Sequence, residues 1–306
     1  MLHSPVLLEE SIDFLITNTS GKYIDATFGR GGHSKKILES ISKDGRLLAI
    51  DKDLEAIRFA QKNFKEKNFS IKHAGFENLD MLCPSEEADG ILFDFGLCST
   101  HYDDSSRGFS FNEAGPLDMR IDTTQSKKLE DLFQDIDAQT LANIIFKYGE
   151  EKEARKISGA IIDSYKRGKI LNTLDLAEII KKTKTQSPKK IHPATKTFQA
   201  LRIFLNDEIN NLEIGLRKSK DLIKTGGRVV CISFHSLEDR SVKQTFAPKK
   251  ISYPKEIPLN NRVIKDFKIV AKKIRPSIDE LQRNKRSRSA IMRAVSYTHL
   301  TLPTMS

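Results

Sequence analysis

The chain has 306 residues, 38% of them hydrophobic, which is enough for one large domain or two smaller ones with a sizeable core. No apolar run can span a bilayer, no signal-peptide layout is present, and three cysteines without a CxxC pair argue for a reducing cytoplasm and against a disulfide framework. The formal net charge of +10 suits a polyanionic partner such as a nucleic acid, although such an excess can also serve solubility alone.

The first predicted unit is a strand, a glycine-rich turn and a helix. An amphipathic helix over residues 3–15 precedes a short buried strand that includes Tyr23 and Ile24, and Asp25 follows. The glycines of the turn are Gly29, Gly31 and Gly32. Apolar residues at one-face spacing then predict a second helix. This order places backbone N–H groups and a helix amino terminus where a polar ligand can bind closely.

Two of the following strands end in carboxylates. Arg46–Asp51 is a buried-strand pattern, and its acid lies about twenty residues beyond the glycines, where nucleotide-binding units hold ribose hydroxyls. Residues 69–73 alternate like a strand, and Asp89–Asp94 is another apolar run. The repeated alternation of strands and helices predicts an α/β fold with a mostly parallel, doubly wound sheet. A glycine turn beside a solvated strand-end acid remains the alternative.

Two side chains after the last of these strands are candidates for chemistry. Asp94 is followed by Phe and Gly as in a kinase, but the other kinase motifs are missing. A strand-end acid can instead accept hydrogen bonds from a ligand's amino group, or it is a solvated turn residue. His101 suits a base, a metal ligand or an ordinary loop residue. Scattered histidines and the lack of HExxH predict no metal site.

A loop rich in aromatic and basic residues comes next. Arg107 and Phe109 lie in RGFSF, and GPLDMR follows. Aromatics interleaved with arginines suit stacking on unpaired bases and gripping phosphates. The equally open alternative is that Phe109 and Phe111 pack into a domain junction.

Helical periodicity then replaces the α/β pattern. Residues 126–216 contain no convincing strand, and apolar spacing predicts one long helix over 198–216. Gly226 and Gly227 end it, and Arg228–Ser233 is a buried strand followed by His235, either a base or a donor to a carbonyl.

These patterns set the expected domain boundaries. The α/β domain comprises residues 1–112 and 217–295, and an all-helical domain of residues 113–216 is inserted in it. Residues 249–273 are predicted to be a basic loop, and a dense basic run closes the domain. Residues 296–306 fit no core pattern and are interpreted as a non-native tail.

Several long motifs occur together and in an unbroken order. They are YIDATFGRGGHS, LLAIDKD, RGFSF, GPLDMR, HPATKTFQALRI, ISFHSLEDR and RSRSA. From the amino terminus to about Val295 the chain resembles the bacterial S-adenosylmethionine-dependent methyltransferases that modify the N4 amino group of a cytidine in small-subunit ribosomal RNA. The resemblance implies a Rossmann-like class I methyltransferase sheet with an inserted all-helical domain. It also implies S-adenosylmethionine as cofactor, and small-subunit ribosomal RNA as partner, free or in an assembled or assembling subunit. Monomer and homodimer both remain open.

The resemblance also assigns residues. The implied cofactor contacts are Gly31, Gly32, His33, Asp51, Phe76, Asp94 and His101. His101 stands where the family has Gln, within DFGLCSTHYD in place of DLGVSSxQLD, so the paired hydrogen bonds of an amide are lost there. Asp94 is the first candidate for accepting a proton from N4, with holding the cofactor as its alternative role. The residues expected to hold RNA are Arg107, Phe109, Arg286 and Arg288.

Three rival functions follow from the same motifs. An NAD-dependent dehydrogenase would need GxGxxG spacing, whereas this chain has GRGGH. A DNA cytosine-N4 methyltransferase would carry a Pro-Pro-aromatic motif after Asp94, which is missing here. A non-catalytic RNA-binding ribosome assembly factor that kept the cofactor pocket is the third possibility.

Overall fold

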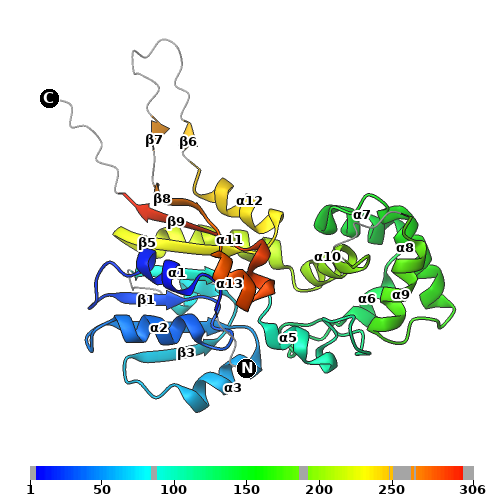
Figure 1. Ribbon diagram of the computed structural model, residues 1–306, viewed down its shortest axis with the longest axis horizontal. Coiled ribbons are helices and arrows are strands. Elements are labelled where there is room, and N and C mark those ends of the chain that lie inside the picture. Colours follow the sequence, from blue (N-terminus) through cyan, green and yellow to red (C-terminus); the bar gives the residue numbers. More distant parts are fainter. Residues whose placement is uncertain are drawn as a thin grey trace, which may run out of the picture. The chain divides into compact units, whose positions relative to one another are not determined.

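The computed structural model describes residues 5–83, 88–185, 192–247, 249–250, 263–264 and 267–298, the two short pairs by their backbone alone. They form two compact units, both drawn in Figure 1. The sheet unit takes the chain up to Gly96 and again from Ile209, and the helical unit is Leu97–Glu208. Among the described residues, none of the helices combines the length and apolar character that crossing a bilayer requires.

These boundaries lie earlier in the chain than the predicted 113–216, and core packing explains the difference. Phe109 is buried in the core of the helical unit, so the loop before residue 113 belongs there. Leu212 and Leu216 are buried in the core of the sheet unit, so the helix that carries them belongs to the sheet.

A seven-stranded sheet forms the centre of the sheet unit, in the order β3-β2-β1-β4-β5-β9-β8. Its strands are β1 (Lys22–Asp25), β2 (Arg46–Asp51), β3 (Phe69–His73), β4 (Ala88–Asp94), β5 (Ile223–Ser233), β8 (Phe267–Ile274) and β9 (Ile291–Tyr297). The strands β1 to β5 are parallel, and β9 is antiparallel to both of its neighbours. This confirms the mostly parallel, doubly wound sheet. The strand order reverses between β1 and β4, and ligands of such sheets bind at the carboxyl ends there.

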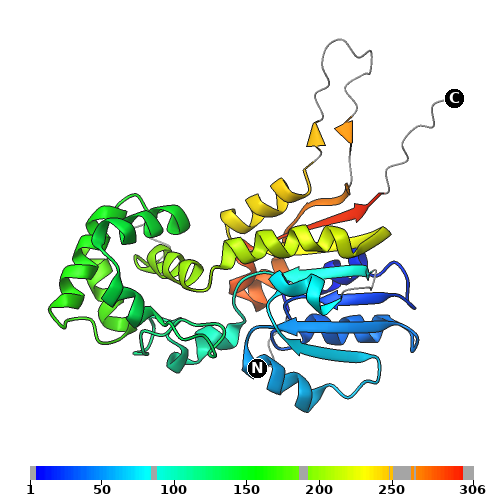
Figure 2. The ribbon, with the colours of Figure 1, turned by 180° about the vertical axis from the view of Figure 1, so that it is seen from behind.

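Helices cover both faces of the sheet. One face packs against α1 (Leu8–Leu15), α2 (Gly32–Ser40) and α3 (Leu54–Asn63), and the other against α4 (Leu79–Leu82), α11 (Glu208–Leu222) and α12 (Ser236–Thr245). Figure 2 shows α11 crossing the face of the sheet that is turned away in Figure 1. Leu92 packs with α1 and α2, and Phe93 with α11, because successive side chains of a strand point to opposite faces.

Shorter elements complete this unit. They are the 3₁₀ segment η1 (Phe76–Asn78), the separate strand pair β6 (Lys249–Lys250) and β7 (Val263–Ile264), helix α13 (Ile278–Arg283) and the 3₁₀ segment η3 (Lys285–Ser289). The last two connect β8 to β9, so the dense basic run leads directly into the sheet.

The helical unit has a core of its own. Its elements are α5 (Ser99–Asp103), η2 (Ser105–Arg107), α6 (Leu129–Asp135), α7 (Ala138–Gly149), α8 (Ala154–Lys166), α9 (Thr173–Thr183) and α10 (Thr195–Leu205). Within its described residues, 97–185 and 192–208, it contains no strand, as the helical periodicity predicted. Leu129, Ile145, Ile161 and Leu201 are fully buried together in this core.

The predicted single helix over 198–216 is wrong, because α10 and α11 divide this stretch. Between them Asp207 has a left-handed φ of 49°. The side chain of buried Asn206 accepts a hydrogen bond from the Ile121 N–H and donates one to the Met119 carbonyl oxygen. These bonds hold Asn206 outside a continuous helix, although the apolar spacing runs through the break. The glycines expected to end this helix lie within β5.

Two further predictions change at the carboxyl-terminal side. Part of the expected basic loop, residues 267–273, belongs to β8. In this strand Phe267 and Ala271 are buried, whereas three lysines and Ile269 are exposed, so its apolar signal is weak. Residues 251–262 and 265–266 of that loop lie outside the described residues. The expected boundary at residue 295 is too early, because Ser296 and Tyr297 complete β9. The Tyr297 ring packs 5.3 Å from that of Phe267, centre to centre. Residues 299–306 lie outside the described residues.

Candidate functional site

The glycine-rich turn joins β1 to α2 at the point where the strand order reverses. Gly29 and Gly31 have φ values of 57° and 72°, which a residue without Cβ adopts without strain. A Cβ on Gly31 would lie 2.5 Å from the Phe64 ring, and one on Gly32 would overlap Pro5. Packing inside the turn therefore requires these glycines, in addition to any close approach of a ligand. No side chain caps the start of α2, so the positive end of its dipole favours a negatively charged group there.

Asp51 is tied to this turn. Its carboxylate accepts hydrogen bonds from the N–H groups of Gly29 at 2.7 Å and Asp53 at 2.8 Å. These two bonds fix the Asp51 carboxylate beside the backbone of the glycine turn. The structure thus brings together the strand-end acid and the glycines that the sequence paired.

Asp25 is a buried acid that the sequence analysis did not single out as a site residue. It accepts hydrogen bonds from the Ser34 hydroxyl at 2.6 Å and from the Thr27 N–H at 3.2 Å. Burial raises the pKa of Asp25 to about 6, and the charge of Asp51 adds to the rise, although both hydrogen bonds oppose it. The signal for Asp25 was present, because it ends its strand as Asp51 and Asp94 end theirs.

Asp94 ends β4 beside Asp25. Its N–H donates to the Thr27 hydroxyl at 2.7 Å, which links β4 to the glycine turn. Burial raises the pKa of the Asp94 carboxyl well above its usual range, and the charges of Asp25 and Glu238 raise it further. Its Oδ1 is buried and accepts no hydrogen bond from the residues that the structure describes. This atom is therefore suited to an amino or cationic group of a ligand.

His33 connects α2 to Asp94. Its Nε2 lies 3.2 Å from the carbonyl oxygen of Val6, and a carbonyl only accepts, so Nε2 carries a proton. Its Nδ1 lies 3.6 Å from Oδ2 of Asp94. The buried ring thus lies between the Val6 carbonyl oxygen and the Asp94 carboxyl group.

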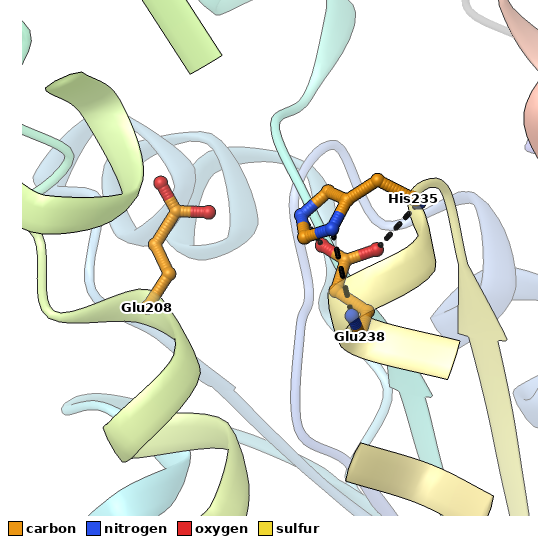
Figure 3. Close-up of side chains that lie close together, drawn as sticks. All are labelled: Glu208, His235 and Glu238. Carbon is orange, nitrogen blue, oxygen red and sulfur yellow. Dashed lines mark hydrogen bonds and ion pairs between the residues drawn. The ribbon is translucent and has the colours of Figure 1, made fainter. Parts of the chain in front are cut away.

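Glu238 was not singled out from the sequence, whereas His235 was named as an open candidate. Figure 3 shows the two side chains together at the start of α12. Glu238 accepts hydrogen bonds from the N–H groups of Phe234 at 2.6 Å and His235 at 3.2 Å. Nε2 of His235 lies 3.0 Å from Oε1 of Glu238, without the angles of a hydrogen bond. The available signal was an acid three residues after a capping residue, which marks a helix start.

Phe76 follows β3 at the same edge of the sheet. Its ring meets those of Phe93 and Phe95 edge-on, at 5.8 and 6.0 Å between centres. A Cβ on Gly215 would lie 2.7 Å from this ring, so α11 also packs against it. The ring is therefore held rigidly, and its expected place near the adenine stays a prediction.

The helical unit holds three predicted site residues. His101 is buried in α5, with its ring centre 5.3 Å from that of Phe109. Arg107 is buried and donates to the carbonyl oxygens of Arg120 at 3.1 Å and Ile121 at 3.0 Å. Phe109 is only 4% exposed. These positions favour a structural role for Arg107 and Phe109, and their contact with RNA stays a prediction.

Arg286 and Arg288 lie in η3 of the sheet unit. Both are exposed, whereas Ser287 between them is fully buried. The segment is anchored by the Asn284 side chain, which accepts a hydrogen bond from the Arg286 N–H at 3.1 Å. The arrangement presents two cationic side chains from a fixed backbone, as binding to phosphates requires.

Comparison with known proteins identifies the chain's relatives. The model of the MraW methylase family matches residues 1–298. A Caldicellulosiruptor bescii protein is 46% identical over 299 residues, which cover 95% of this chain and 97% of its own. A Hydrogenovibrio crunogenus protein is 44% identical over 299 residues, with 95% of both chains covered. Both relatives are named ribosomal RNA small subunit methyltransferase H.

A third relative, from Francisella tularensis subsp. novicida, bears the same name. It is 46% identical over 305 residues, covering 96% of this chain and 99% of its own. The family match includes the glycine turn, Asp51, Asp94 and the buried helix start at Glu238. The resemblance inferred from the motifs is confirmed, and the chain belongs to the MraW methylase family.

Proposed function

We propose that this protein transfers a methyl group from S-adenosylmethionine to N4 of a cytidine in small-subunit ribosomal RNA. The match to a methylase family over residues 1–298 carries the proposal, supported by relatives named for methylating small-subunit ribosomal RNA. The acidic edge between β1 and β4 supplies the site. We place the protein in the cytoplasm, as a monomer or a homodimer.

The residues of that edge fit the charges of the proposed cofactor. S-adenosylmethionine carries a sulfonium and an ammonium group, and the buried carboxyl groups of Asp25 and Asp94 favour positive charge nearby. Its carboxylate suits the uncapped positive end of α2. Oδ1 of Asp94 is a buried acceptor without a donor among the described residues, and an amino group of the cofactor would supply that donor.

Each predicted contact then has a role. Gly31, Gly32 and His33 lie along the cofactor's methionine part, with the N–H groups of Gly32 and His33 as donors, because that of Gly31 already bonds the Phe28 carbonyl oxygen at 2.7 Å. Asp51 binds the ribose hydroxyls, and Phe76 packs near the adenine. When bound, S-adenosylmethionine supplies an activated methyl group. His101 has one ring nitrogen to offer in place of an amide, so it makes a single hydrogen bond.

Asp94 is the proposed proton acceptor. Burial and the charges of Asp25 and Glu238 raise the pKa of Asp94, which disfavours its ionised form until positive charge arrives beside it. Once ionised, it can accept a hydrogen bond from the exocyclic amine of cytosine, whose lone pair is delocalised into the ring. That bond localises the lone pair on N4 and takes up the proton as the new bond forms. Most of the acceleration comes from alignment of the reacting atoms.

Access to the base requires that the cytidine leave its stack. Exposed Arg286 and Arg288 are proposed to hold phosphates near the target. If so, RNA affinity should fall steeply with salt on a log–log plot, and the slope should decrease by about 1 for each arginine removed.

Methyl transfer to defined substrates tests the proposal. Purified protein with methyl-labelled S-adenosylmethionine is given intact small subunits, free small-subunit ribosomal RNA or DNA, and the nucleosides are analysed by mass spectrometry. N4-methylcytidine from RNA supports the proposal. A methylated deoxycytidine would favour the DNA enzyme, and cofactor binding without transfer to any substrate would favour an assembly factor.

The role of Asp94 needs its own measurement. In Asp94→Asn we expect the single-turnover rate at saturating cofactor to fall by about 10²-fold or more, because the amide cannot accept the proton. Loss of cofactor affinity with an intact saturated rate would limit Asp94 to binding. Asp44→Asn, on an exposed turn of the same unit, serves as the control.

A further inference from the structure

The end of α7 and the exposed side of α10 lie against each other within the helical unit. A Cβ on Gly149 would lie 2.6 Å from the Lys196 carbonyl oxygen, so this glycine allows the two helices to approach closely. Figure 1 shows α7 and α10 side by side in this unit. The Gln199 side chain stabilises the contact by donating a hydrogen bond to the Tyr148 carbonyl oxygen at 3.3 Å.

Two aromatic rings line this contact on the solvent side. Phe204 is 38% exposed and Tyr148 is half-buried. Their ring centres are 6.4 Å apart, with the planes tilted by 41°. Single exposed apolar residues are ordinary on protein surfaces, but two adjoining, partly exposed rings can form a platform for a flat, apolar group. We call Lys147, Tyr148, Gln199 and Phe204 the aromatic seam.

Two lysines lie at this contact between α7 and α10. The Lys147 ammonium lies 4.8 Å from the centre of the Tyr148 ring, and the Lys147 side chain is exposed. Lys196 precedes Gln199 by three residues, so the two lie on one side of α10. The Lys196 ammonium donates to the neutral carbonyl oxygen of Glu150 at 2.9 Å, which leaves its positive charge uncompensated by that bond.

Arg202 differs from these lysines. Its guanidinium makes a bidentate pair with Glu208, at 2.7 and 2.8 Å, and only 10% of its side chain is exposed. Its charge is therefore neutralised within the unit. The positive charge beside the rings comes from lysines, which hold phosphates as point charges without fixed geometry.

We propose that the aromatic seam binds an unpaired stretch of the RNA substrate, with a base stacked on Phe204 and Tyr148 and a phosphate held by Lys147. This inference rests on the proposed function and assigns it a contact surface. Stacking accepts any base, because every base has a π-face, so the seam contributes affinity and position rather than sequence selection. Gln199 supplies an amide at the edge of the platform.

Affinity for RNA tests the seam. We expect Phe204→Ala to weaken binding of single-stranded RNA from the small subunit by roughly 5- to 150-fold, the range of one stacked base. Phe204→Leu keeps the apolar volume but lacks the ring, and should be weakened almost as much. Phe204→Trp should retain the affinity of the wild type.

A matched control lies on α7, the helix that carries Tyr148. Phe146 is 64% exposed, but it is two residues from Tyr148, so it points to another side of α7. Phe146→Ala should leave RNA binding unchanged. Lys147→Met should reduce the slope of log affinity against log salt by about 1. Calorimetry with S-adenosylmethionine and thermal unfolding should match the wild type for every variant.

The outcomes separate this inference from the function itself. If the wild type binds RNA and Phe204→Ala and Phe204→Leu bind it equally well, the seam is not an RNA surface and the inference is overturned. The inference is also overturned if Phe146→Ala lowers the affinity for RNA as much as Phe204→Ala does. That result would indicate a protein-binding or nonspecific apolar surface. If the wild type has no affinity for small-subunit RNA, the proposed function fails as well.

Discussion

Replacement of the buried acid Asp25 by asparagine should stabilise the protein near neutral pH. Asp25 is 0% exposed and accepts hydrogen bonds from Ser34 and Thr27. The amide of the Asp25→Asn variant would have the same shape, its oxygen can accept from Thr27, and its NH₂ can donate to a rotated Ser34 hydroxyl. The substitution therefore removes a charge while it preserves the bonding.

The raised pKa sets the magnitude. The pKa of Asp25 rises from an ordinary 3.8 to about 6 in the folded protein. At about 1.4 kcal/mol for each tenfold change in proton affinity, the charged form costs the folded state roughly 3 kcal/mol. Between pH 3.8 and about 6 the folded protein binds more protons than the unfolded chain, so its free energy of unfolding falls as the pH rises. Above this window the cost is complete, and below it the cost is absent.

The charges of neighbouring carboxylates raise the pKa values of the buried acids further. Asp51 raises the pKa of Asp25, and the charge of Asp25 contributes to the raised pKa of Asp94. Removing the Asp25 charge therefore also eases ionisation of Asp94.

Unfolding by urea at a series of pH values measures this effect. Hydrogen exchange of amides in β1 and β4 reports on the sheet unit alone. We expect Asp25→Asn to exceed the wild type by about 3 kcal/mol near neutral pH and to lose this advantage by about pH 4. The exposed Asp44→Asn should show no such trend, because its carboxylate faces water in both states. A difference that does not change with pH, or a less stable variant at neutral pH, would refute the reasoning.

Three further predictions concern other parts of the chain. Gly31→Ala should lower the free energy of unfolding by about 2 kcal/mol or more, since φ is +72° and the new methyl meets a phenylalanine ring; an unchanged melting temperature would contradict this. Burial alone would raise the pKa of Asp89, but hydrogen bonds from Lys224 and two other donors lower it, so Asp89→Asn should cost about 2 kcal/mol at neutral pH. That cost should shrink as the pH falls below 3.8 in urea titrations, and a constant cost would disprove the pairing. Arg202→Met should destabilise the helical unit by about 3 kcal/mol by hydrogen exchange, whereas exchange equal to the wild type would show that its bidentate pair is dispensable.

The strands and the acids at their ends could be predicted because both signals are local. A buried parallel strand is an apolar run, and Arg46–Asp51 and Asp89–Asp94 each place a carboxylate directly after one. The glycine turn and Asp51 are near enough in sequence to be paired by spacing. The hydrogen bond from Gly29 to Asp51 shows that this spacing corresponds to contact.

The remaining features depend on residues that are distant in the chain. Asp94 owes its raised pKa to burial and to charges on β1 and α12, which no local pattern brings together. The break at Asn206 depends on bonds to Met119 and Ile121, although the apolar spacing passes straight through it. Phe109 in an aromatic and basic loop suggested an RNA contact, whereas its burial follows from helices much later in the chain.

The Arg202 guanidinium bonds Tyr102 near the start of the helical unit and Glu208 at its end. It therefore fastens together the two points where the chain enters and leaves this insertion. Strands β4 and β5 pair across the whole insertion, and closing a flexible loop of on the order of a hundred residues costs about 4 kcal/mol in chain entropy. If the insertion folds early, contacts within it offset that entropy cost. Strand β5 then pairs with β4 as if only a short turn joined the two strands. Protection of β4 and β5 amides before those of α10 during refolding would exclude this order of events.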